Sequence, residues 1–64
     1  MTLSEYTKQV MENLMANPVV LPQMLPVQLV NKNVGLIAEN WEVGESVENT
    51  VTMLLLRHKK EAQP

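Results

Sequence analysis

Hydrophobic residues recur at helical spacing near the amino terminus. The apolar positions recur at helical spacing, which places them on one face of a helix: Leu3, Tyr6, Val10 and Leu14, with Met11 and Met15 nearby. Thr2 and Glu5 have the separation of a capping box, in which the two side chains satisfy backbone amides at a helix start. We therefore expect an amphipathic helix over about residues 3–16. It should end before Pro18, because the residue that precedes a proline is pushed out of the α region.

Prolines interrupt the middle of the chain at regular intervals: Pro18, Pro22 and Pro26. Proline fixes φ and has no N–H donor, so residues 18–30 are expected to form an extended arm or short turns. The even spacing places the prolines on one side of a strand, which permits only an edge strand or a free arm. Residues 27–30 contain no proline and are the best strand candidate. A packed connector between helices is the alternative for this segment.

A second helix is predicted after the arm. Its apolar positions follow helical spacing: Val34, Ile37, Ala38 and Trp41. Asn31 or Asn33 can cap its start, and Gly44 is placed to end it.

The last helix should begin at Ser46, which is a good N-cap residue. Glu48 lies in its first turn and the basic residues in its last turn, so the charges complement the helix dipole: Arg57, Lys59 and Lys60. The apolar residues cover much of its circumference: Val47, Val51, Met53, Leu54, Leu55, Leu56 and His58. Such a helix needs contacts on more than one side, and a second copy of the chain would supply them. The alternative is that the amino-terminal helix covers this surface within one monomer.

The length of 64 residues allows one small domain, which we divide into a helix over 1–17, an arm or strand over 18–30, and a helix pair over 31–61. A domain of this size buries only about 60% of the surface that its unfolded chain exposes. Disulfides are excluded because the chain has no cysteine, so oligomerisation is the expected support. The predicted fold is mainly α, in an intertwined homodimer.

Composition argues against most enzyme chemistry. One histidine and no cysteine make a metal site improbable on ligand number, and the serines and threonines are better explained as helix caps or surface residues. The net charge of −2 lacks the basic excess of a typical nucleic-acid binder. No apolar run reaches the roughly 18 residues of a membrane span, and no secretory signal is visible. We expect a cytoplasmic, non-enzymatic protein without a cofactor.

The order of strand, helix, glycine turn and capped amphipathic helix over residues 27–60 resembles the ribbon-helix-helix family of small dimeric DNA-binding repressors. The resemblance is strongest over residues 44–60, where Ser46 stands at the capping position and Lys59 and Lys60 close the helix. The resemblance implies a homodimer whose paired strands enter the major groove of duplex DNA and regulate transcription.

Residue by residue, the resemblance implies two sets of contacts. Gln28 would read a base edge, the amides of Ser46 and Val47 would hold a phosphate, and Asn31 and Lys32 would add backbone contacts. The dimer interface would be formed by Val27, Leu29, Val51, Leu54 and Leu55.

A protein-interaction module is the alternative function. An inhibitor, adaptor or assembly factor could use the apolar, weakly charged segment over residues 18–30 to engage a protein partner. The acidic pI of about 5.2 favours this alternative, whereas the order of elements favours the repressor.

Overall fold

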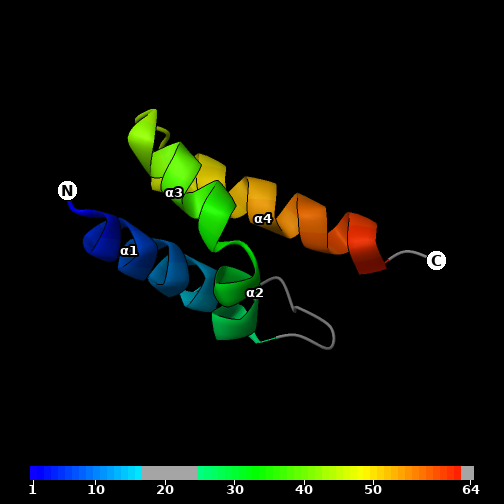
Figure 1. Ribbon diagram of the computed structural model, residues 1–64. Helices are drawn as coiled ribbons and strands as arrows, with labels where there is room; N and C mark the ends of the chain where they lie inside the picture. Colours follow the sequence, from blue (N-terminus) through cyan, green and yellow to red (C-terminus); the bar gives the residue numbers. More distant parts are fainter. Residues whose placement is uncertain (17–24, 63–64) are drawn as a thin grey trace.

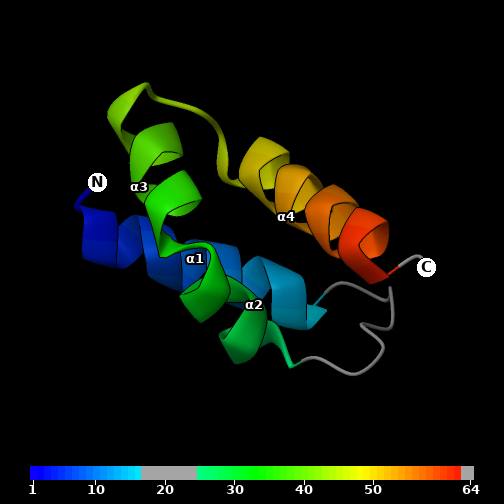
Figure 2. The same ribbon diagram turned by 45° about the vertical axis from the view of Figure 1, so that its right-hand side comes forward.

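The computed structural model describes residues 1–16 and 25–62, and within them the chain forms four helices and no strand. They are α1 (Leu3–Ala16), α2 (Pro26–Lys32), α3 (Val34–Glu42) and α4 (Val47–Ala62). α1 packs against each of the other three helices, and α1 and α4 run in the same direction (Figure 1). The second view shows α2 and α3 crossing beside them (Figure 2). The prediction of a mainly α fold is confirmed.

The start and end of α1 agree with the sequence pattern. The Glu5 N–H donates to Thr2 Oγ1 at 3.1 Å, which is one half of the predicted capping box. In the second bond of a capping box, the Glu5 carboxylate would accept the Thr2 backbone N–H. Here the Glu5 carboxylate accepts the Thr2 hydroxyl instead, at 3.3 Å. The helix ends at Ala16, as the following Asn17-Pro18 predicts.

The strand predicted over residues 27–30 is wrong, because these residues lie in α2. Pro26 occupies the first turn of that helix, where its missing N–H costs nothing and its fixed φ suits the helix. Gln28 Oε1 accepts the Leu25 N–H at 2.9 Å and so caps the start. Leu29 and Val30 then face the core. The remainder of the predicted arm, residues 18–24, lies outside the described residues.

Asn33 separates α2 from α3. Its N–H donates to the Val30 carbonyl at 3.0 Å, and its carbonyl accepts the Ile37 N–H at 3.0 Å. Its buried side chain donates to the Leu29 carbonyl at 2.8 Å. One residue therefore ends one helix, starts the next and satisfies its own buried amide.

Gly44 ends α3 as predicted. With a φ of +79° it lies in the left-handed region, which glycine enters without a Cβ penalty. The Gly44 N–H donates to the Trp41 carbonyl at 3.2 Å, and the Glu45 N–H donates to the Asn40 carbonyl at 2.8 Å. This pair of bonds is a Schellman motif. Ser46 Oγ then accepts the Asn49 N–H at 3.1 Å and caps α4, which confirms the predicted start of that helix.

The hydrophobic core is built from the four helices of the described residues. Eight buried side chains form it: Tyr6, Val10, Leu14, Leu29, Val30, Ile37, Val51 and Leu54. The apolar stripe of α4 is therefore covered mainly by α1. Within the described residues, cover by the amino-terminal helix therefore holds for the buried side of α4, whereas Met53 and Leu56 remain exposed, and the predicted homodimer stays a prediction.

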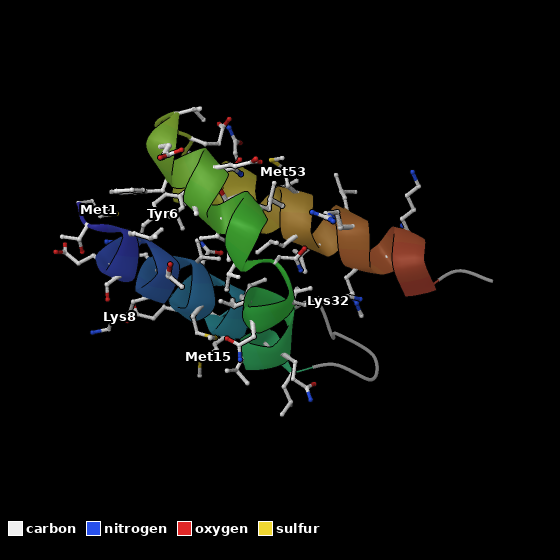
Figure 3. All side chains as sticks on the ribbon, in the orientation of Figure 1. Met1, Tyr6, Lys8, Met15, Lys32 and Met53 are labelled. Atoms are coloured by element: carbon white, nitrogen blue, oxygen red, sulfur yellow. The ribbon has the colours of Figure 1, made fainter. Side chains whose placement is uncertain are left out.

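Three polar side chains cross this core in a hydrogen-bonded chain. Asn40 Nδ2 donates to Thr50 Oγ1 at 3.0 Å, the Thr50 and Tyr6 hydroxyls bond each other, and the Tyr6 hydroxyl lies 3.0 Å from the Glu45 carbonyl oxygen. In this order each hydroxyl accepts one bond and donates one. Figure 3 shows Tyr6 between α1 and the pair formed by α3 and α4. The chain of bonds thus fixes α1, α3 and the start of α4 against one another.

We predict that Thr50→Val lowers the free energy of unfolding by about 1–3 kcal/mol, because it removes the two buried hydrogen bonds to Tyr6 and Asn40 without changing the side-chain shape. Thr52→Val is the matched control: Thr52 is exposed, so the change should stay within about 0.5 kcal/mol. Urea unfolding followed by circular dichroism measures both. Equal effects of the two substitutions would contradict the importance of the buried bonds.

A second pair of variants tests the core. Leu54 is fully buried at 0% exposure, so Leu54→Ala should cost about 2–5 kcal/mol of unfolding free energy. Leu56, two residues further along α4, is 61% exposed, and Leu56→Ala should cost less than about 0.5 kcal/mol. The same urea titration distinguishes them, and a larger loss for Leu56→Ala would place the core on the wrong face of α4.

Candidate functional site

The residues predicted to contact DNA fall into two separate groups. Gln28, Asn31 and Lys32 lie on α2, while Ser46 and Val47 lie at the start of α4. α3 stands between the groups and is nine residues long, or about 13 Å. The structure therefore does not bring the five residues together on one chain.

Most of these residues have a structural role in the fold. The Gln28 side chain caps α2 through the Leu25 N–H, and Ser46 Oγ caps α4 through the Asn49 N–H. Val47 is half-buried against the core. Asn31 and Lys32 are exposed, and Figure 3 shows Lys32 at the end of α2 nearest α4.

The start of α4 is acidic. Glu45 lies just before the helix and Glu48 in its first turn. Asn49 Nδ2 donates to the Glu45 carboxylate at 2.8 Å and holds it against the helix start. These two carboxylates already complement the positive end of the helix dipole. A phosphate bound by the amides of Ser46 and Val47 would meet both of them.

Residues predicted at the dimer interface are divided between core and surface. Leu29, Val51 and Leu54 are buried within the chain, and Leu55 is half-buried against the same core. Val27 is 46% exposed. Only Val27 among the five is therefore largely available to another molecule.

His58 is buried on α4, and its Nε2 has no hydrogen-bond partner within residues 1–16 and 25–62. The same part of the chain contains no group of three metal-ligating side chains. A single imidazole supplies one metal ligand, whereas protein metal sites use three or four. Within the described residues, His58 is a buried side chain on the same side of α4 as Val51 and Leu54.

Several exposed apolar side chains fall into two groups, while others, such as Val34 and Val43, lie elsewhere. Met15, at the end of α1, and Leu25 and Val27, at the start of α2, come from two helices that pack together; we call these three residues the α1–α2 apolar surface. Met53 and Leu56 lie one turn apart on α4. Figure 3 shows Met15 and Met53 at opposite edges of the molecule, so the two places are distinct.

The α1–α2 apolar surface lies in a segment without formal charge. No Asp, Glu, Lys, Arg or His occurs anywhere in residues 13–31. Leu25 is 63% exposed and Met15 is 69% exposed. The sequence pattern indicated Leu25 and Val27 as part of an apolar segment but assigned Met15 to the buried helix face. Met11 and Met15, which lie one turn apart beside the core stripe, were the signal that the apolar surface of α1 is wider than that stripe.

Within the described residues, no helix combines the length and the apolar character that crossing a membrane requires. Comparison of the chain with protein-family models, with curated proteins and with solved structures found no significant match.

We predict that Ser46→Ala lowers the free energy of unfolding by about 1 kcal/mol, because the Asn49 N–H loses its side-chain acceptor. Ser46→Asn is the matched control and should retain most of the stability, since asparagine caps helices well. Thermal unfolding monitored at 222 nm, a wavelength that reports helix, compares them. If both variants lose stability equally, the cap is not what Ser46 contributes.

Proposed function

We propose that this chain is a non-enzymatic protein-interaction module that binds a protein partner through the α1–α2 apolar surface. The observation that carries the proposal is the exposure of Met15, Leu25 and Val27 within a segment that has no charged residue. None of the three belongs to the buried core cluster or packs against it.

The chemistry of this surface suits another protein. The buried centres of protein interfaces are depleted in charged residues and enriched in methionine. Methionine also adapts its shape to a partner, because its side chain is unbranched and polarisable. The exposed polar neighbours Gln28 and Asn31 are uncharged and can form hydrogen bonds at the rim. The expected partner is therefore a protein segment with an apolar, uncharged face, such as one side of an amphipathic helix.

The DNA-binding regulator of ribbon-helix-helix type remains the alternative prediction, but fewer observations support it. Its groove-reading strand would include Gln28, which lies on a helix with its side chain bonded to the Leu25 N–H. Its phosphate site would lie between the carboxylates of Glu45 and Glu48. Like charge at a phosphate contact weakens the electrostatic part of DNA affinity.

The experiment compares the native chain with the triple variant Met15→Gln, Leu25→Gln, Val27→Gln. Each chain is immobilised and exposed to extract from cells that express it naturally, and the retained protein is identified, purified and titrated by calorimetry. We expect one partner that binds the native chain directly and loses at least about tenfold in affinity for the variant, which is about 1.4 kcal/mol.

Val43→Gln is the matched control, since Val43 is 77% exposed but lies just after α3, next to Glu42 and outside the α1–α2 apolar surface. It should bind the partner like the native chain. An equal loss for Val43→Gln, or a partner indifferent to the triple variant, would contradict the proposed surface.

Selection from a random pool of DNA duplexes addresses the alternative. Enrichment of a palindromic site whose affinity falls steeply with salt would replace the proposal by the DNA-binding regulator. Absence of enrichment, together with the protein partner described above, would support the interaction module.

A further inference from the structure

The outer face of α4 carries a stripe of exposed side chains, of which Met53 also contacts α3 by accepting a hydrogen bond from Asn40 Nδ2 at 3.4 Å. Asn49, Met53, Leu56 and Lys60 follow at intervals of four, three and four residues, and all are exposed. Successive intervals of three and four residues align side chains along one side of a helix. The buried residues Val51, Leu54 and His58 form the opposite side, which faces the core. We call the four exposed residues the α4 outer stripe.

Charge is distributed in one direction along this stripe. At the start of α4 lie Glu48 and the Glu45 carboxylate, which Asn49 holds at 2.8 Å. At the end of α4 lie Lys59 and Lys60. Met53, at 39% exposure, and Leu56, at 61%, occupy the middle. The order is therefore acidic, apolar and basic.

We propose that a second copy of this chain docks on the α4 outer stripe, with the two copies of α4 antiparallel about a two-fold axis. Such an order of charges is complementary to itself only when the helices run in opposite directions. Placing Met53 opposite Leu56 of the second copy brings Asn49 opposite Lys60 of that copy. Glu48 then lies within one turn of Lys59 of the second copy, on the same flank of the pair.

The other arrangements fit the charges less well. Parallel helices would set Glu48 beside its own counterpart and Lys59 beside its own, and like charges repel. An uncharged partner would offer no opposite charges to pair with those at the two ends of the stripe. In the two-fold arrangement the pair of Glu48 and Lys59 occurs twice, and Met53 and Leu56 of both copies are buried.

This interface differs from the dimer that the ribbon-helix-helix resemblance implied. That dimer would have used Val51 and Leu54, which face the core of one chain. It is also separate from the α1–α2 apolar surface, so the second copy does not depend on the proposed function.

Sedimentation equilibrium of the native chain over a range of concentrations tests the proposal. We expect a reversible monomer–dimer equilibrium that shifts toward monomer as salt rises, because the flanking charges are exposed and screened. Met53→Gln with Leu56→Gln should abolish the dimer. Circular dichroism of the same samples verifies that the helices persist, as expected for exposed positions.

Two single charge reversals give the sharper test. Glu48→Lys places like charges opposite each other in its own homodimer, and Lys59→Glu does the same with the opposite sign. Each homodimer should dissociate about fivefold more readily than the native one, or more. An equal mixture of the two variants restores both pairs, so the heterodimer should recover the native affinity.

The outcomes divide clearly. Recovery in the mixture supports the antiparallel arrangement, since no effect on a single chain produces it. A chain that is monomeric at every concentration overturns the proposal. A dimer that tolerates both the reversals and the double glutamine variant also overturns it, because its interface then lies elsewhere. Loss of the protein partner with the Met15, Leu25 and Val27 variant is a separate result that leaves this test unaffected.

Discussion

The buried hydrogen bonds among Tyr6, Thr50 and Asn40 are the constraint on which the arrangement of the four helices depends. Apolar contacts alone tolerate small slides of one helix along another, whereas hydrogen bonds in a low-dielectric core hold only at fixed distances. Tyr6 also reaches the carbonyls of the turn before α4, at 3.0 Å and 3.3 Å. The same bonds therefore fix the positions of α1 and α3 relative to α4, and the direction in which α4 leaves the turn.

With α4 held in this way, one side faces α1 and the other side faces outward. The Schellman turn at Gly44 and the cap at Ser46 fix where the helix begins, so the outer stripe occupies a defined face. A chain without cysteine and with a small core has little other means to fix its geometry. The two proposed interfaces both follow from this division, since each uses apolar side chains that the core leaves exposed.

Local signals in the sequence predicted α1 and α4 accurately. The cap at Thr2, the stop before Pro18, the glycine at 44 and the cap at Ser46 are short-range interactions between residues a few positions apart. α2 was missed because proline was taken to exclude a helix, although Pro26 occupies the first turn, where proline is accepted. α2 is only seven residues long, so its hydrophobic periodicity is a weak signal for a helix. The three prolines gave a stronger signal for an extended segment.

The sequence by itself determined the helical character of both ends of the chain, the turn at Gly44, the direction of charge along α4 and the uncharged segment over residues 13–31. These depend on which residues are neighbours along the chain. Only the tertiary structure decided which apolar side chains would be left outside. Leu54 and Leu56 differ by two positions and have the same chemistry, yet one is at 0% and the other at 61% exposure, because α1 covers only one side of α4. Burial depends on contacts between residues far apart in sequence, and those contacts placed Val51 and Leu54, which were expected at a dimer interface, in the core of one chain.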